Sequence, residues 1–216
     1  MNRKILFVIV GGLLLLVFVI ATVLFQKNRD ALHSASMGQK QDITQREGAP
    51  VKGAADARVT IVEFLDPACG TCRDFYPFVK QLIEQHQGKV RVMVRYAPLH
   101  AGSDQVVKML EAARHQGQFW QALELLFGSQ QRWVVNHTSQ PMRARNILNA
   151  LDVDQEKLTA DMNRPDVTRA IQQDLQDGQT LNVRATPEFF VNGRPMPSFG
   201  YKQLSDLVEQ AVADAY

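Results

Sequence analysis

The apolar positions of the chain follow two periods, and the changes between them predict the order of its elements. The run Val59 to Leu65 is largely apolar, which is typical of a buried strand. Apolar residues then recur at helical spacing from Phe75 to Ile83, and between residues 90 and 96 they alternate with other residues, as in a strand. The pattern therefore predicts a strand, a helix and a second strand in succession.

The remainder of the chain continues with helices and ends as a strand and a helix. From residue 103 to residue 177 apolar residues recur at helical spacing, and Pro165 stands where one of these helices would begin. Glu188 to Val191 has strand character, and the Asn192-Gly193 pair that follows is a hairpin turn signal. The apolar positions from Leu204 to Val212 predict a closing amphipathic helix.

The first apolar run of the chain is longer than a strand or an ordinary core helix. Ile5 to Phe25 carries no charge and is long enough to cross a hydrocarbon core about 30 Å thick. Arg3 and Lys4 precede it, which favours a cytoplasmic amino terminus with the rest of the chain exported. The run is longer than the apolar region of a cleaved signal peptide, which is the alternative. We therefore predict an uncleaved membrane anchor over residues 1–26.

Composition divides the remaining residues into a tether and a folded domain. Residues 27–56 are rich in Gln, Lys, Ala, Gly and Ser and hold few large apolar side chains, so they are predicted to form a flexible linker. The folded domain is placed at residues 57–216, with the helical stretch as an insertion at about 101–181. The net charge of +2 gives no reason to predict a nucleic-acid partner.

The chemistry of the chain is concentrated in its only two cysteines. Cys69 and Cys72 are separated by Gly70 and Thr71, and the pair lies between the first predicted strand and the first predicted helix. Cys69 therefore falls at a helix amino terminus, where unpaired backbone N–H groups and the helix dipole stabilise a thiolate. The thiolate is the form of cysteine that attacks disulfides. This context predicts a redox-active pair.

Other uses of two cysteines fit the sequence less well. A structural zinc site needs about four ligands, but the chain has no second cysteine pair and its five histidines are scattered. We interpret His100 as a loop residue and predict no bound metal or cofactor. A structural disulfide over so short a loop would constrain the unfolded chain little. Two other classes stay open: a non-enzymatic module that holds a soft metal such as Cu(I), and a tethered adhesin-like or chaperone domain with a vestigial pair.

The order of elements resembles the thioredoxin fold with a helical insertion, as in bacterial DsbA-like periplasmic oxidoreductases. Glu63 lies before Cys69 where that family has a buried acid, and Pro77 lies where the family often kinks its active-site helix. Thr186-Pro187 matches the family's cis-proline loop, which faces the cysteines. The resemblance covers residues 57–216. It implies an α/β thioredoxin fold with an insertion, which the predicted transmembrane helix would precede.

This resemblance implies thiol-disulfide exchange on exported cysteine-containing proteins. Cys69 would form a mixed disulfide with the substrate and Cys72 would resolve it. Glu63 would have a raised pKa and exchange protons with Cys72, whereas its alternative is a glutamate that reaches solvent. Thr186 and Pro187 would contact an extended substrate strand, whereas the alternative is a trans proline that begins an edge strand.

The dipeptide between the cysteines bears on the direction of electron flow. Gly70 and Thr71 supply neither a charge nor a ring to stabilise the Cys69 thiolate, unlike the CPHC pattern of strong oxidants. The stretch from Phe64 to Cys72 and the threonine before Pro187 also resemble disulfide isomerases and reductases of the DsbC and DsbG type. The sequence therefore favours a reductase or isomerase, and a disulfide-forming oxidase of the DsbA type is the alternative.

The resemblance and the predicted anchor together imply a location and partners. Residues 5–25 would cross the lipid bilayer once, in a bacterial inner membrane, and the catalytic domain would lie in the periplasm. The redox partner implied is a membrane protein of the DsbD or DsbB type.

Overall fold

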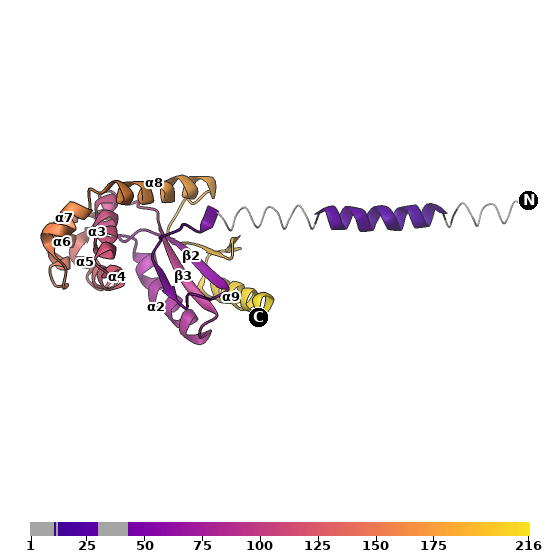
Figure 1. Ribbon diagram of the computed structural model, residues 1–216, viewed down its shortest axis with the longest axis horizontal. Helices are drawn as coiled ribbons and strands as arrows, with labels where there is room; N and C mark the ends of the chain where they lie inside the picture. Colours follow the sequence, from indigo (N-terminus) through magenta and orange to yellow (C-terminus); the bar gives the residue numbers. More distant parts are fainter. Residues whose placement is uncertain (1–10, 12, 30–42) are drawn as a thin grey trace, which may run out of the picture. The chain divides into compact units, whose positions relative to one another are not determined.

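The computed structural model describes residues 11, 13–29 and 43–216 of the chain. It divides into two compact units, Met1–Lys40 and Gln41–Tyr216 (Figure 1).

In the first unit, residues 13–29 are helical. Within the described part of the chain, no helix is both long enough and apolar enough to cross a bilayer. The anchor predicted from Ile5 to Phe25 includes residues 5–10 and 12, which lie outside the described residues. The anchor therefore stays a prediction.

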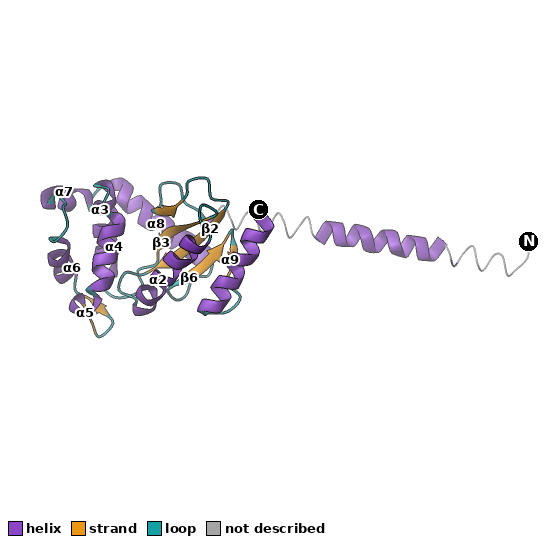
Figure 2. Cartoon of the chain, turned by 90° about the horizontal axis from the view of Figure 1, so that it is seen from below, coloured by secondary structure: helices purple, strands orange, loops and turns teal. Residues whose placement is uncertain are grey.

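The second unit is built on a mixed five-stranded sheet in the order β1-β3-β2-β6-β7. Figure 2 labels the central strands β3, β2 and β6. β2 and β3 are parallel, and the other neighbours are antiparallel. The strands are β1 (Val51–Gly53), β2 (Val59–Leu65), β3 (Val90–Tyr96), β6 (Glu188–Val191) and β7 (Arg194–Pro195). The predicted strands at 59–65, 90–96 and 188–191 are confirmed, as is the hairpin turn at Asn192-Gly193.

Helices cover both faces of this sheet. α2 (Gly70–Gln85) and α9 (Tyr201–Ala215) pack on one face through a shared apolar cluster with β2, β3 and β6. α8 (Pro165–Thr180) lies against the other face, where Gly178 approaches the ring of Phe64. The helices between β3 and α8 are α3 (Ser103–His115), α4 (Phe119–Gly128), α5 (Gln130–Trp133), α6 (Pro141–Leu148) and α7 (Gln155–Asp161), with a small hairpin of β4 (Val134–Val135) and β5 (Thr138–Ser139).

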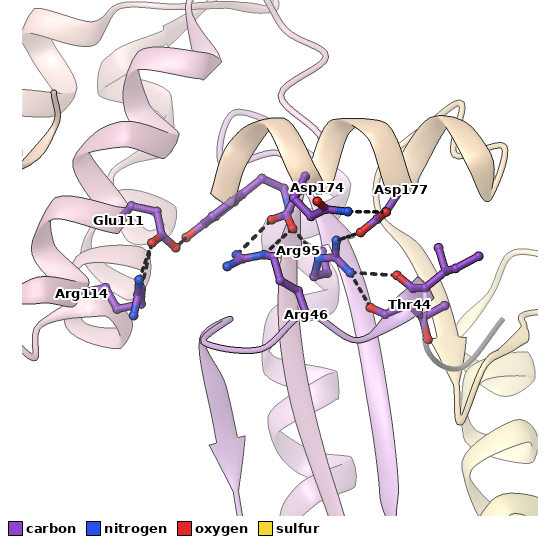
Figure 3. A network of polar contacts seen from close by, with 10 residues as sticks. Thr44, Arg46, Arg95, Glu111, Arg114, Asp174 and Asp177 are labelled. Carbon is purple, nitrogen blue, oxygen red and sulfur yellow. Dashed lines mark hydrogen bonds and ion pairs between the residues drawn. The ribbon is translucent and has the colours of Figure 1, made fainter. Parts of the chain in front are cut away.

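A buried charged network joins the start of the second unit to the sheet and to α8 (Figure 3). We call Arg46, Arg95, Asp174 and Asp177 the amino-terminal clasp. Arg46 Nε donates to Asp174 at 2.6 Å, and Arg95 donates to the same carboxylate and, at 2.5 Å, to Asp177. Arg95 also donates to the carbonyl oxygen of Thr44 at 2.7 Å. Charged groups that are buried persist when they are paired and hydrogen-bonded in this way.

The clasp corrects the predicted end of the linker. Residues 43–56 belong to the folded unit, because they contain Arg46 of the clasp and β1, which pairs with β3. Composition could not reveal this, since the partners of these residues lie far along the chain. Residues 30–42 of the predicted linker at 27–56 lie outside the described residues.

Candidate active site

The turn between β2 and α2 is shaped by Asp66, which is fully buried. Its backbone carbonyl accepts a hydrogen bond from the N–H of Cys69 at 3.0 Å, and its carboxylate accepts one from the N–H of Ala68 at 2.8 Å. Because of this turn, Cys69 lies at the amino-terminal end of α2 in an extended conformation, with φ −76° and ψ 122°. The sulfur therefore sits at the start of a helix, as the sequence predicts.

Asp66 is itself held by the beginning of the helical insertion. The Ser103 hydroxyl donates to one carboxylate oxygen. The backbone N–H and ring Nδ1 of His100 both lie 2.8 Å from the other. His100 does stand in a loop before α3, as interpreted from the sequence, but its contacts help to fix the turn that carries Cys69. This role had no signal in the sequence.

The two cysteines are both free of disulfide bonds, and their environments push their pKa values apart. Cys69 is 7% exposed, whereas Cys72 is fully buried one turn into α2. Hydrogen bonding from the Cys72 thiol is the largest cause that lowers the pKa of Cys69, to about 5. Burial opposes this shift, and the Thr186 side chain and the N–H groups of Thr71 and Cys72 add to it.

The pKa of Cys72 moves in the opposite direction, well above the usual thiol value. Burial is the largest cause, followed by its hydrogen bond to Cys69 and by the charge of Glu63. At neutral pH the pair therefore consists of a thiolate at Cys69 and a thiol at Cys72. Attack on a disulfide requires a thiolate, and Cys69 is the cysteine of the pair that can supply one at neutral pH.

Glu63 lies on β2 with its side chain 2% exposed, which excludes the alternative that it reaches solvent. Within the described part of the chain, its Oε1 atom has no hydrogen-bond partner. Burial is the largest cause that raises the pKa of Glu63 to about 8, and the charge of Cys69 adds to it. A buried carboxyl group with a pKa near neutrality is suited to proton transfer.

The Thr186-Pro187 peptide bond is cis, so the alternative of a trans proline is excluded. When Cys69 is protonated, its thiol donates a hydrogen bond to the carbonyl oxygen of Thr186 at 3.2 Å. Thr186 is half-buried and Pro187 is buried, and both precede β6. The loop therefore faces the cysteine pair, as the family resemblance implies.

Gln130 is a site residue that sequence reasoning missed. It lies on α5 of the insertion, is 5% exposed, and its Nε2 donates to the carbonyl oxygens of Pro67 and Cys69 at 3.0 Å each. A glutamine in a helical stretch with no motif around it carries no signal of contact with a distant turn.

A groove of about 730 Å³ opens along the outer side of α2, between this helix and the α4–α5 corner. Arg73 and Gln130 line the groove near the cysteine turn, and Tyr76 and Lys80 line it farther along α2. Tyr76 and Lys80 both donate to Glu124 of α4, at 2.7 and 3.1 Å. These contacts connect the active-site helix to the insertion.

Comparison with known proteins gives one family. A family model described as Thioredoxin matches residues 45–210. The chain is similar to the crystal structure of a thioredoxin-like oxidoreductase from Silicibacter pomeroyi DSS-3, with 32% identity and a TM-score of 0.68, covering 78% of this chain and 95% of that one.

Two curated relatives differ in how much of their own length the chain matches. The chain is 30% identical over 144 residues to the Na(+)/H(+) antiporter NhaA of Herminiimonas arsenicoxydans, covering 67% of this chain and 22% of the antiporter. It is 24% identical over 177 residues to Disulfide bond formation protein D of Bacillus subtilis (strain 168), covering 76% of this chain and 77% of that protein. The chain spans a quarter or less of the length of the first antiporter relatives it matches.

Proposed function

The chain belongs to the thioredoxin family, and we propose that it is a DsbA-like thiol-disulfide oxidoreductase that acts on exported cysteine-containing proteins. One observation carries the proposal: a thiolate-forming Cys69 lies beside a buried Cys72 thiol, with the buried acid Glu63 close to both. The names of the solved oxidoreductase and of the Bacillus relative support the same activity.

The first step is attack by the Cys69 thiolate on a substrate disulfide. A bond forms between the Cys69 sulfur and one substrate sulfur, while the substrate S–S bond breaks and its other sulfur leaves as a thiolate. The product is a mixed disulfide between Cys69 and the substrate. Thr186 and Pro187 face Cys69, and the backbone beside them can pair with an extended substrate segment.

The second step is resolution by Cys72. Once Cys69 is in a mixed disulfide it carries no charge, so one of the two causes that raise the pKa of Glu63 disappears. The pKa of Glu63 then falls, so Glu63 releases its own proton to solvent and, as a carboxylate, takes the proton of Cys72. The Cys72 sulfur attacks Cys69, the substrate leaves as a second thiolate, and the enzyme ends with a Cys69–Cys72 disulfide. Two electrons have passed to the substrate, and the reverse sequence oxidises it.

Two directions of electron flow are candidates. The uncharged Gly70-Thr71 dipeptide favours the reductase or isomerase direction. The lowered pKa of Cys69 favours disulfide formation, because a stabilised thiolate stabilises the reduced enzyme. A glutathione redox titration separates them: a potential near that of thioredoxin, about −270 mV, supports a reductase, and one near that of DsbA, about −120 mV, supports an oxidase.

We also propose that residues 5–25 anchor the protein in the bacterial inner membrane, with residues 1–26 as the anchor and the folded unit in the periplasm. The uncharged apolar run supports the anchor, and an exported location suits disulfide exchange. A membrane protein of the DsbD or DsbB type would then recycle the cysteine pair.

Trapping of mixed disulfides tests the proposed activity. In cells that express Cys72→Ala, we expect covalent complexes with exported proteins that dissociate on reduction, because the second step is blocked. The matched control is Cys69→Ala, which should trap none. If the pair instead served to hold a soft metal, Cys72→Ala would lose the metal and trap nothing, and the proposed activity would be wrong.

A further inference from the structure

The short helix α5 holds the Gln130 side chain in a fixed position. Trp133 of the same helix is fully buried, and its ring N–H donates to the carbonyl oxygen of Leu126 on α4 at 2.8 Å. The backbone carbonyl of Trp133 accepts a hydrogen bond from the N–H of Gln140 at 2.7 Å. These contacts of Trp133 fix α5, and with it the Gln130 amide that contacts the cysteine turn.

Gln130 contacts the main chain of the turn where it becomes α2. The Cys69 carbonyl accepts the first helical hydrogen bond, from the N–H of Arg73 at 3.2 Å, and also accepts one from Gln130. The Pro67 carbonyl accepts the second donated bond. Among the hydrogen bonds of the described residues, Gln130 supplies the side-chain donor to these two carbonyls, so it fixes the backbone on both sides of Ala68.

The position of this backbone decides where the Cys69 sulfur lies. The N–H groups of Thr71 and Cys72 stabilise the thiolate only while the sulfur lies over the start of α2. Asp66 accepts hydrogen bonds from the N–H groups of Ala68 and Cys69 in the turn. Its carboxylate also accepts one from the Ser103 hydroxyl of the insertion. Gln130 donates to two carbonyl oxygens of the same turn, so the insertion contacts both the N–H groups, through Asp66, and the carbonyl groups of the turn.

We propose that Gln130 is a positioning residue of the active site, through which the helical insertion sets the reactivity of Cys69. This inference rests on the proposed function, because it concerns the same cysteine. A purely structural role, in which Gln130 only satisfies two buried carbonyls, would lower stability and leave the acidity of Cys69 unchanged.

Gln130→Met tests the proposal, because methionine keeps a similar length and loses both donated bonds. The matched control is Gln131→Met, at the exposed neighbouring position. The rate of Cys69 alkylation is measured against pH in the full chain, together with the melting temperature. We expect the alkylation midpoint of Gln130→Met to rise by about 0.5–1 pH unit, since the thiolate loses stabilisation. The control should keep the parent midpoint. A lower melting temperature with an unchanged midpoint would overturn the proposal.

The parent protein provides a second measurement that does not depend on how the variant folds. The side-chain N–H protons of Gln130 should exchange with solvent more slowly than those of Gln131, measured by NMR, because they are donated and buried. Equal exchange rates would overturn the positioning role. These readouts are independent of substrate, so failure of mixed-disulfide trapping in Cys72→Ala would contradict the proposed function while leaving the Gln130 result interpretable.

Discussion

Glu63, Cys69 and Cys72 interact electrostatically, and the charge of each changes the proton affinity of the others. Burial alone disfavours a charge on Glu63, and a Cys69 thiolate beside it disfavours that charge further. The same two causes, burial and a neighbouring charge, keep Cys72 protonated. This coupling keeps the resting site at one negative charge, on the Cys69 sulfur.

The raised pKa of Glu63 makes stability depend on pH. Between pH 4.5 and about pH 8 the folded protein keeps a proton on Glu63 that the unfolded chain has released, so this group lowers the free energy of unfolding as pH rises. Glu63→Gln removes the effect. We expect the variant to gain roughly 2–4 kcal/mol relative to the parent at pH 8, and no such gain at pH 4, by denaturant unfolding of the reduced proteins. An equal difference at both pH values would contradict the buried-acid assignment.

The same substitution should impair the second chemical step. Glutamine cannot accept the proton of Cys72, so release of substrate from the mixed disulfide should slow by about 100-fold, a typical contribution of a general base. Alkylation of Cys69 measures the first step and should remain fast. Release at the parent rate in Glu63→Gln would show that water, rather than Glu63, takes the proton.

At the scale of elements, the sequence predicted those whose signal is local. β3, α2 and α9 have clear periods and β2 is a continuous apolar run, and the structure confirms all four. β1 was missed because a three-residue strand has no measurable period and depends on pairing with β3. Arg95 is fully buried although β3 alternates, because α8 and residues 43–46 cover that face. Such tertiary contacts cannot be inferred from periodicity.

The contribution of the amino-terminal clasp to the stability of the fold can be tested at Arg46. Arg46→Met leaves Asp174 with one fewer partner in a buried site, so we expect a loss of about 1–3 kcal/mol in the free energy of unfolding. Arg164→Met is the matched control, because Arg164 pairs with Asp166 at the exposed start of α8 and should change stability little. Alkylation of Cys69 should be unchanged in both variants. If the two variants were equally stable, the clasp would not contribute to the fold.

At the scale of the folded unit, the insertion and the thioredoxin core share one apolar interior. Cys69, Cys72 and Leu65 lie in the same buried cluster as the insertion residues Leu110 and Leu123. This shared interior explains which residues of the site could be predicted from the sequence. The cysteine pair, Glu63 and the Thr186-Pro187 loop belong to motifs, whereas Asp66, His100 and Gln130 act through contacts that form only when the insertion folds against the turn.

The proposed exchange depends most on Cys69 being a thiolate at neutral pH while Cys72 is a thiol. The measurement is alkylation of the reduced protein, with both cysteines present, over a series of pH values, followed by mass mapping of the modified residue. We predict modification of Cys69 with a midpoint near pH 5, and no modification of Cys72 until Cys69 has reacted. Faster modification of Cys72, or a Cys69 midpoint near the free-thiol value of about 8.5, would contradict the account.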